Sequence, residues 1–401
     1  MWEQIRDHEF RAAFLKIHEP LTLCFAEAHE RKPVMNTMQP QHRLTPIWLD
    51  CDTGHDDAFA ILLAARSDDV DLLGISTVYG NAPLQNTTYN TRAILKAIGR
   101  EDVPVYPGAS KPSTREAAHA PDIHGASGLD GTHCLPEPTM PAQTTDAVQV
   151  MYERLNAEPA GTAWLVAVGA LTNIAALFIK HPGLVDHIAG LSIMGGAVGG
   201  GFTDAPMGTV AGEGERFGNH TPYAEFNIYC DPEAARAIFS NPVLAAKTTL
   251  TPLDLPHQFL ATSEVQKSLL LSEVTMASGT PVRRLFFEIL TFFAKTYADV
   301  FGLKEGPPLH DPLAVAAAFR RELFVYNKPG QTEHEHFTVD VVVEGEHGNS
   351  DQIRSGPSQC GRTVVRSLLP GQPGVTIPRG LDAPALWNLI EACLGAAEAA
   401  S

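Results

Sequence analysis

The sequence predicts an α/β protein in which helices flank a largely parallel central sheet. From residue 46 onward, short apolar runs alternate with stretches of helical periodicity, which is typical of βα units on a parallel sheet. No internal repeat and no linker long enough to divide this part of the chain interrupts the alternation. We therefore expect a single domain with a Rossmann-like sheet over residues 46–395, preceded by an extension of residues 1–45.

The first strand is expected at residues 46–50, a short apolar run that ends in a cluster of acidic residues. Comparable runs bounded by turn-forming residues predict further strands at residues 71–78, 103–106, 163–168, 188–194, 247–253, 337–344 and 363–368. Helical periodicity predicts helices between the strands, for example at residues 88–98, 171–178 and 232–239, and a final helix at 383–394.

Three segments do not follow this alternation. Residues 107–141 are rich in Gly, Pro, His and Ser, and residues 195–220 are rich in Gly with few core-forming side chains. Long stretches of this kind inside a compact domain are usually functional loops or disorder. Residues 1–45 mix acidic, basic and apolar side chains, so we expect a helical or partly disordered extension without a catalytic role.

The charge and cysteine content narrow the range of partners. The 401 residues include 29 Lys and Arg against 46 Asp and Glu, which gives a formal charge of −17 and no basic stripe. Nucleic acid and anionic membranes are therefore not expected as partners. No apolar stretch reaches the roughly 18–20 residues that a membrane-spanning helix needs. Six scattered cysteines without a CxxC pair favour a reduced, cytoplasmic setting.

Four aspartates lie within eight residues in the string LDCDTGHDD, at Asp50, Asp52, Asp56 and Asp57. Carboxylates this close repel one another and raise some of their pKa values unless a cation or polar ligand holds them together. The cluster follows the first predicted strand, and open α/β sheets bind ligands beyond the carboxyl ends of their strands. A helix N-terminus would stabilise one or two of these acids, but it does not explain four.

The chemistry of the acids favours a hard cation. His310-Asp311-Pro312 adds another carboxylate far downstream, and no group of thiolates accompanies it. Oxygen ligands of this kind suit Ca²⁺ or Mg²⁺ better than zinc. Ca²⁺ is favoured if carboxylates, a backbone carbonyl and waters share the site, because it accepts irregular shells of about 6–8 oxygens.

The segment LDCDTGHDDAFAILLA resembles the N-terminal signature of the inosine-uridine preferring nucleoside hydrolase family, with Thr53 where proline is more usual. Other segments match in the family's order: TVYGN ending at Asn81, IHGASGLDG from Ile123, VAVGALTNIA from Val166, IMGGA from Ile193, GNHTPYAEFNIYCDPEAA from Gly218, and LHDPLAVA from Leu309. The likeness runs from residue 46 to the final helix. It implies a single domain of the nucleoside hydrolase type, similar to eukaryotic uridine ribohydrolases.

The resemblance also implies a set of site residues, each at a position that matches a family motif. The implied calcium ligands are the side chains of Asp52, Asp57 and Asp311 and the backbone carbonyl of Val168. Asp50 matches a supporting residue. The implied ribose-binding residues are Asp56, Asn219, Glu225 and Asn227.

The implied catalytic residues begin with Asp52 as general base and Asn81 beside the nucleophilic water. Two histidines are candidates for assisting the departing base. His310 resembles the base-side acid of the inosine-uridine subgroup, and His124 matches a position associated with pyrimidine nucleosides. Phe293 and Tyr297, spaced i, i+4 on a predicted helix, are candidates for the base pocket, although such a pair more often belongs to the core.

The expected activity is calcium-dependent hydrolysis of the N-glycosidic bond of ribonucleosides, namely uridine and also cytidine and inosine, in nucleoside salvage. The resemblance further implies a homo-oligomer, a dimer or tetramer. An enlarged loop between Met194 and Asn219 departs from the simpler family pattern, which leaves the base preference open. Two alternatives remain at this point: a haloacid-dehalogenase-type phosphatase using the DxDxT segment at residues 50–53, and a non-catalytic, calcium-stabilised nucleoside-binding protein.

Overall fold

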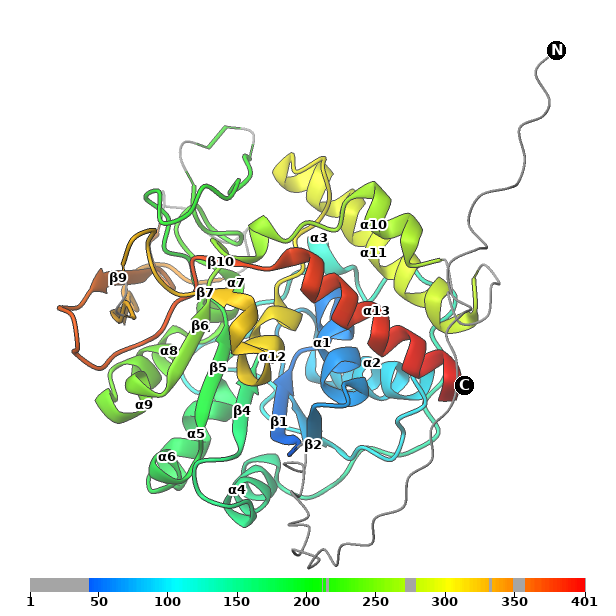
Figure 1. Ribbon diagram of the computed structural model, residues 1–401, viewed down its shortest axis with the longest axis horizontal. Helices are drawn as coiled ribbons and strands as arrows, with labels where there is room; N and C mark the ends of the chain where they lie inside the picture. The colour runs from blue at the N-terminus through cyan, green and yellow to red at the C-terminus, as the bar shows by residue number, and fades with distance from the viewer. Residues whose placement is uncertain are drawn as a thin grey trace, which may run out of the picture. The chain divides into compact units, whose positions relative to one another are not determined.

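The computed structural model describes residues 43–210, 212–213, 216–270, 279–331, 334–348 and 358–400. Residues Arg43–Ser401 form one compact unit. The expected N-terminal extension lies outside the described residues up to residue 42. Within the described residues, a six-stranded parallel sheet is covered by helices on both faces (Figure 1). None of the described helices is both long and apolar enough to cross a bilayer.

The central sheet has the strand order β3-β2-β1-β4-β5-β6, and every pair of neighbours is parallel. The strands are β1 (Thr45–Cys51), β2 (Val70–Thr77), β3 (Val105–Pro107), β4 (Trp164–Ala167), β5 (Gly190–Met194) and β6 (Thr248–Thr251). Each overlaps a predicted run, so the predicted Rossmann-like α/β class is confirmed. The order reverses between β1 and β4, and such a reversal opens a crevice beyond the carboxyl ends of the two strands.

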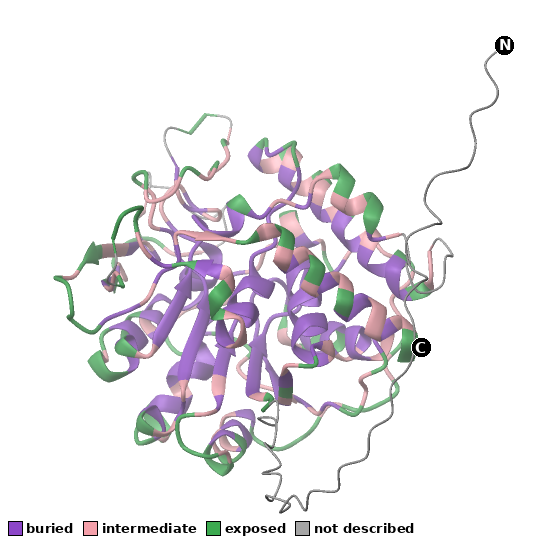
Figure 2. Ribbon diagram, viewed as in Figure 1, coloured by how far each residue is buried: buried purple, intermediate pink, exposed green. Residues whose placement is uncertain are grey.

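Helices cover both faces of the sheet, and α11 and α13 pack on α1. On the face toward which Leu49 points lie α1 (His55–Arg66), α2 (Leu84–Ala97), α11 (Pro281–Phe301), α12 (Asp311–Phe319) and α13 (Ala383–Ala400). On the opposite face lie α4 (Ala147–Ala157), α5 (Thr172–Lys180), α6 (Leu184–His187), α8 (Pro232–Phe239) and α9 (Pro242–Ala246). Figure 2 shows the buried residues concentrated in the strands and on the inner sides of these helices.

Shorter elements complete the described part of the chain. They are α3 (Pro121–His124), α7 (Phe226–Cys230), α10 (Ser263–Ser268), the 3₁₀ turns η1 (Pro256–Gln258) and η2 (Arg321–Leu323), the pair β7 (Phe324–Val325) and β10 (Gly380–Leu381), and the antiparallel pair β8 (Phe337–Val341) and β9 (Thr363–Ser367). Of the two long predicted loops, residues 107–141 contain only α3 after the end of β3, and the described part of residues 195–220 contains no helix or strand.

The packing of β1 fixes the position of the acidic loop that follows it. The Trp48 side chain is fully buried and lies against Gly74 of β2, where a Cβ atom would come within 2.8 Å of the indole ring. The indole nitrogen donates to the Ser76 hydroxyl at 2.9 Å. Glycine at position 74 therefore makes room for the tryptophan, which anchors β1 against β2.

The C-terminal helix extends beyond its predicted end. α13 continues to Ala400, whereas the periodicity predicts an end at residue 394. The additional turns are rich in alanine, the best helix former, and carry Glu398. Arg283 of α11 is fully buried, with its Nε 2.9 Å from Glu398 and its Nη2 2.5 Å from Glu391. This ion-pair cluster joins the last turns of α13 to α11.

Candidate active site

The loop between β1 and α1 is held by Asp57. The N-cap of α1 is Gly54, whose N–H donates to Oδ2 of Asp57 at 2.9 Å, and the N–H of Asp52 donates to Oδ1 at 3.1 Å. Asp57 therefore does cap the helix, as the simpler explanation of the acidic cluster suggested. That explanation does not extend to the Asp52 side chain, which accepts the N–H of Asn81, nor does it account for the contact of Asp56 with His310.

The Asp52 carboxylate is fully buried beneath two backbone turns. Its Oδ2 accepts the N–H of Asn81 at 2.8 Å, whereas its Oδ1 has no hydrogen-bond partner among the described residues. A Cβ atom at Gly80 would lie 2.0 Å from Oδ2, and one at Gly169 would lie 2.7 Å from Oδ1. Glycines at both positions allow this close approach. A buried carboxylate oxygen without a partner is costly, and a cation or ligand would satisfy it.

Three further carboxylates converge beside Asp52. Asp56, Asp57 and Asp311 each offer an oxygen, and these oxygens all lie within 4.8 Å of one another. Asp311 is the first residue of α12, which brings it from far along the chain to the end of β1. Of the predicted metal ligands, Asp57 and Asp311 belong to this group. The Asp52 side chain does not, although the backbone N–H of Asp52 donates to Asp57. Val168 follows directly after β4, and its N–H donates to the Asp50 carbonyl at 2.9 Å.

The electrostatics of the cluster are those of crowded, buried acids. Burial, followed by the charge on Asp56, raises the pKa of Asp57 to about 7. Burial and the neighbouring carboxylates also raise the pKa values of Asp52 and Asp311. Asp56 behaves differently: burial alone would raise its pKa, but the hydrogen bond and charge of His310 outweigh burial and lower it. Nδ1 of His310 lies 3.0 Å from Oδ2 of Asp56.

This donor set fits a hard divalent cation. It consists of oxygens alone, it includes the unsatisfied Oδ1 of Asp52, and a dication would relieve the repulsion that raises the carboxylate pKa values. The Val168 carbonyl stands at the same edge of the sheet and accepts the Asn227 amide at 2.9 Å. The described residues thus include an acidic group able to hold a metal ion.

A pocket opens above these carboxylates at the carboxyl edge of the sheet. Predicted site residues make up most of its lining: Asp56, Asn81, His124, Val168, Asn219, Glu225, Asn227, Phe293, Tyr297, His310 and Asp311. Asp52 and Asp57 are fully buried and do not line the pocket. The sequence analysis did not single out the remaining lining residues: Ala120, Ile123, Met194, His220, Phe226 and Phe301.

The polar wall of the pocket is built around the N-terminus of α7. The Glu225 carboxylate caps this helix, accepting the N–H groups of Asn227 at 2.8 Å and Ile228 at 3.0 Å. The side-chain oxygen of Asn219 accepts the N–H of Phe226 at 2.9 Å. Two predicted ribose-binding residues therefore act locally as caps, which fixes their side chains toward the pocket.

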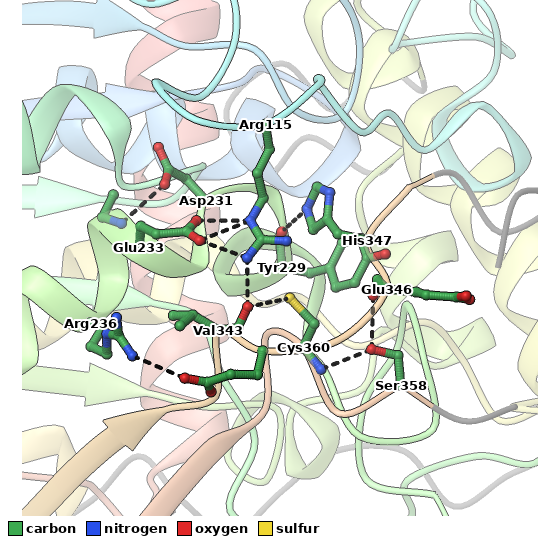
Figure 3. Close-up of polar contacts among 12 residues, drawn as sticks. Arg115, Tyr229, Asp231, Glu233, Arg236, Val343, Glu346, His347, Ser358 and Cys360 are labelled. Carbon is green, nitrogen blue, oxygen red and sulfur yellow. Dashed lines mark hydrogen bonds and ion pairs between the residues drawn. The ribbon is translucent and has the colours of Figure 1, made fainter. Parts of the chain in front are cut away.

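The segment after β8 contacts Tyr229 of α7 (Figure 3). The Tyr229 carbonyl accepts a hydrogen bond from Nε2 of His347 at 2.7 Å, and the two rings stack with centroids 4.4 Å apart. Arg115 donates to Glu233 of α8 and to the Val343 carbonyl, each at 2.6 Å. These contacts tie the helix that carries Asn227 to the β8–β9 region.

The opposite wall is aromatic and comes from α11. Phe293, Tyr297 and Phe301 recur every fourth residue along one side of the helix, and each lines the pocket. The rings of Phe293 and Tyr297 meet edge to face, with centroids 4.7 Å apart. The pair is nearly fully buried and also lines the pocket. That it contacts the base of a nucleoside stays a prediction. Tyr297 also hydrogen-bonds to Asn219, which joins the two walls.

Both predicted histidines line this pocket, in different surroundings. His310 contacts Asp56 through Nδ1, and its Nε2 is buried without a partner among the described residues. Nδ1 of His124 lies 3.1 Å from Nδ1 of His55, the first residue of α1. The sequence analysis missed His55, although it stands within the acidic string. Its place at the first position of the helix that follows β1, at the carboxyl edge of the sheet, could have indicated a role near the pocket.

The family model of the inosine-uridine preferring nucleoside hydrolases matches residues 47–388 of this chain. The chain belongs to this family. The uridine nucleosidase of Saccharomyces cerevisiae is 43% identical over 273 residues, which cover 67% of this chain and 74% of the yeast protein. The pyrimidine-specific ribonucleoside hydrolase RihA of Citrobacter koseri is 39% identical over 279 residues, covering 70% of this chain and 80% of that protein.

Solved nucleoside hydrolases share the fold. A purine-preferring ribonucleoside hydrolase from Gardnerella vaginalis aligns with a TM-score of 0.70 at 27% identity, over 88% of this chain and 99% of that one. A plant nucleoside hydrolase, PpNRh1, aligns with a TM-score of 0.68 at 26% identity, over the same shares. The resemblance drawn from the sequence is confirmed, and with it the enzyme class of nucleoside N-ribohydrolase.

The family assignment removes the phosphatase alternative, and the geometry gives the physical reason. Asp50, the first acid of the DxDxT segment, is fully buried within β1 and does not line the pocket. Its Oδ1 accepts hydrogen bonds from the Ser76 hydroxyl and from the Asn173 amide, the latter at 2.8 Å. Asp50 therefore does not face the pocket in which a phosphate ester would bind. Its supporting role stays a prediction.

Proposed function

We propose that this protein hydrolyses the N-glycosidic bond of ribonucleosides, with uridine as the principal substrate and cytidine and inosine as further ones, in a calcium-dependent reaction. The observation that carries the proposal is the convergence of the Asp56, Asp57 and Asp311 carboxylates, with the buried Asp52 next to them, at a pocket with one polar and one aromatic wall. The names of the yeast and Citrobacter relatives, which refer to uridine and pyrimidine ribonucleosides, support the pyrimidine preference.

The reaction itself explains the need for a buried anionic site. Cleavage of a ribosyl C–N bond builds positive charge on the anomeric carbon and the ring oxygen. Carboxylates fixed in a pocket with little water stabilise that charge more than they stabilise the neutral substrate. The buried cluster of acids thus favours the transition state.

We assign Asp52, Asp57, Asp311 and the Val168 carbonyl as calcium ligands. When bound, calcium supplies a water of lowered pKa at this position. Asp52 then acts as the general base that takes the proton of the attacking water. Asn81 supports this arrangement, because its backbone N–H donates to Asp52 and its side chain donates to Asp57 at 3.0 Å.

The polar wall suits the sugar. Asp56 and Asn227 bind the 2′- and 3′-hydroxyl groups, and Asn219 and Glu225 complete the ribose site. Both asparagines are fixed by hydrogen bonds to neighbouring backbone groups, at 2.9 Å in each case. Binding energy gained at the sugar is thereby used to position the reacting carbon.

The departing base needs a proton or a hydrogen bond. We assign this task to His310, which lines the pocket and whose Nε2 has no partner among the described residues. The Asp56 carboxylate, 3.0 Å from Nδ1, holds the His310 ring in place with Nε2 left free for the base. Phe293 and Tyr297 provide a flat surface for the base. His124, the second candidate, lines the same pocket with a different hydrogen-bond pattern.

Three broader features belong to the same proposal and are supported by the family resemblance: a role in nucleoside salvage, a cytoplasmic location and assembly as a homodimer or homotetramer. The charge of −17 disfavours nucleic acid and anionic membranes as partners.

The test is a panel of uridine, cytidine, inosine, adenosine and guanosine, incubated with calcium or with a chelator, in which released reducing sugar is measured. We expect uridine to be cleaved and the chelator to abolish cleavage. Asp52→Ala should abolish turnover, whereas the exposed control Asp68→Asn should retain it. Binding of uridine without release of ribose would instead favour the non-catalytic alternative, and full turnover by Asp52→Ala would remove the general-base assignment.

A further inference from the structure

We propose that His55 is a positioning residue that fixes the tautomer of His124, so that Nε2 of His124 presents a lone pair to the pocket and accepts a hydrogen bond from an N–H or O–H group of the bound nucleoside. The inference rests on the proposed function, because it concerns how the same pocket recognises its substrate. It gives His124 a role different from that of a proton donor.

The His55 ring is held in one orientation. It is fully buried and stacks on Phe292, with centroids 5.0 Å apart and planes 8° apart, and on Phe293, at 5.4 Å and 3°. Nε2 lies 2.9 Å from the Asp130 carbonyl oxygen, and Nδ1 lies 3.1 Å from Nδ1 of His124. A carbonyl oxygen only accepts hydrogen bonds, so Nε2 of His55 carries a hydrogen.

The hydrogen bond from Nε2 of His55 to the Asp130 carbonyl determines which nitrogen donates in the contact between His55 and His124. The His55 ring is fully buried and neither of its nitrogens hydrogen-bonds to a carboxylate, so burial outweighs the charges of Asp56 and Asp130 nearby and His55 is neutral. A neutral imidazole has one N–H, which in His55 is already on Nε2, and its Nδ1 therefore accepts. His124 must then donate from Nδ1. Burial lowers the pKa of His124 to about 3, so this ring is neutral too and its Nε2 bears a lone pair.

One contact favours the opposite arrangement and is weaker. The backbone N–H of His55 lies 3.5 Å from Nδ1 of His124, a contact that would need a lone pair there. That arrangement would require the hydrogen of His55 on Nδ1 and would place the lone pair of Nε2 against the Asp130 carbonyl at 2.9 Å. Two acceptors at that distance repel, whereas a 3.5 Å contact gains little. The chain from His124 through His55 to Asp130 therefore determines the tautomer.

The free nitrogen of His124 is available to a ligand. His124 lines the pocket, and no described residue hydrogen-bonds to its Nε2. Gly54 permits the close placement of the ring, since a Cβ atom there would lie 2.5 Å from Nδ1 of His124. A nucleoside offers two kinds of donor to such an acceptor: an N–H on the edge of the base, such as N3–H of uracil, and a hydroxyl of the sugar, such as the 5′-hydroxyl.

The first test is spectroscopic and needs no activity. Protein labelled with ¹⁵N at its histidine rings is studied by long-range ¹H–¹⁵N correlation, and the His124 signals are assigned from the spectrum of His124→Asn. We expect the ring hydrogen of His124 on Nδ1 in the wild type. His55→Gln should keep it there, because the amide offers a donor to Asp130 and an acceptor to His124. His55→Phe keeps a flat ring but removes the acceptor, so the Nε2–H tautomer should gain population.

The second test measures substrate discrimination. For each variant, kcat/KM is measured for uridine and for two analogues. 3-Methyluridine lacks the base N–H, and 5′-deoxyuridine lacks the 5′-hydroxyl. The kcat/KM of uridine is then divided by that of each analogue, which gives two ratios. Loss of one hydrogen bond should lower one of these ratios by about 3- to 10-fold in His55→Phe but not in His55→Gln. A change with 3-methyluridine assigns the base as donor, and a change with 5′-deoxyuridine assigns the sugar.

Two outcomes would overturn the inference: a wild-type His124 with its hydrogen on Nε2, or unchanged ratios for both analogues in His55→Phe. Circular dichroism and thermal unfolding establish whether each variant is folded. If His55→Phe does not fold, the ¹H–¹⁵N spectrum of the wild type still decides the tautomer of His124. Absence of nucleoside cleavage by the wild type would refute the proposed function and would leave the tautomer readout intact, so the two failures are distinguishable.

Discussion

Replacing Asp50 by asparagine should change how the stability of the metal-free protein depends on pH. Asp50 is fully buried, and its Oδ2 has no hydrogen-bond partner among the described residues. Burial raises its pKa from 3.8 to about 7, against the opposing hydrogen bonds of Ser76 and Asn173. The folded protein thus holds this proton more tightly than the unfolded chain does. Stability from this group is present at low pH and is lost as the pH rises toward 7.

The magnitude follows from the two pKa values. Between pH 5 and pH 8, ionisation of Asp50 should reduce the free energy of unfolding of the wild type by about 2.5 kcal/mol, whereas Asp50→Asn loses nothing from this position. The asparagine retains an oxygen for Ser76 and Asn173, but its buried amide N–H₂ costs about 1–3 kcal/mol at every pH. The informative quantity is therefore the change in the difference between the two proteins, and not the difference at one pH.

The assay is urea unfolding of wild type and Asp50→Asn in chelator at pH 5 and pH 8. The wild type should lose about 2.5 kcal/mol relative to the variant between these values. The exposed Asp68→Asn should follow the wild type. A constant difference between wild type and Asp50→Asn at both pH values would refute the conclusion that Asp50 is a buried acid held against its tendency to ionise.

Three further predictions concern the metal site and the C-terminal helix. Asp57→Asn and Asp311→Asn should each weaken calcium binding by at least about 100-fold, measured by calorimetry, because each removes a charged ligand; unchanged affinity would contradict the ligand assignment. Calcium affinity of the wild type should rise by about 10-fold or more between pH 6 and pH 8, because Asp57, whose pKa is about 7, must lose its proton to bind the ion; affinity independent of pH would argue against this linkage. In urea unfolding, Arg283→Met should lower the free energy of unfolding by about 3–5 kcal/mol, because it leaves the Glu398 carboxylate buried opposite an apolar side chain. The control Arg236→Met, at an exposed position, should lower it by less than about 1 kcal/mol.

The sequence predicted the sheet because its strands are short apolar runs with turn residues at both ends. The helix α8 was predicted to the residue, since Pro232 marks its first turn and the apolar periodicity ends at Phe239. The end of α13 was not predicted, because periodicity weakens in an alanine-rich segment and the partner of Glu398 lies on another helix.

The site residues could likewise be predicted only where they depend on local sequence, and not where they depend on contacts between distant segments. Local pattern locates the acids at residues 50–57, but that Asp311 joins them was inferred from a family resemblance, since it depends on how α12 packs beside α1. The pocket residues Met194 and Phe301 look like ordinary core positions in the sequence, and only the fold turns them toward the pocket. Likewise, the orientation of His55 is set by Asp130 and Phe292 from distant segments, so no spacing rule could reveal it.

The most direct measurement is a crystal structure of the protein with calcium and an unreactive ribonucleoside analogue. We predict one calcium ion bound by Asp52, Asp57, Asp311 and the Val168 carbonyl, with the sugar hydroxyls of the analogue against Asp56 and Asn227. An analogue bound in the pocket with no ion between these carboxylates would contradict this prediction.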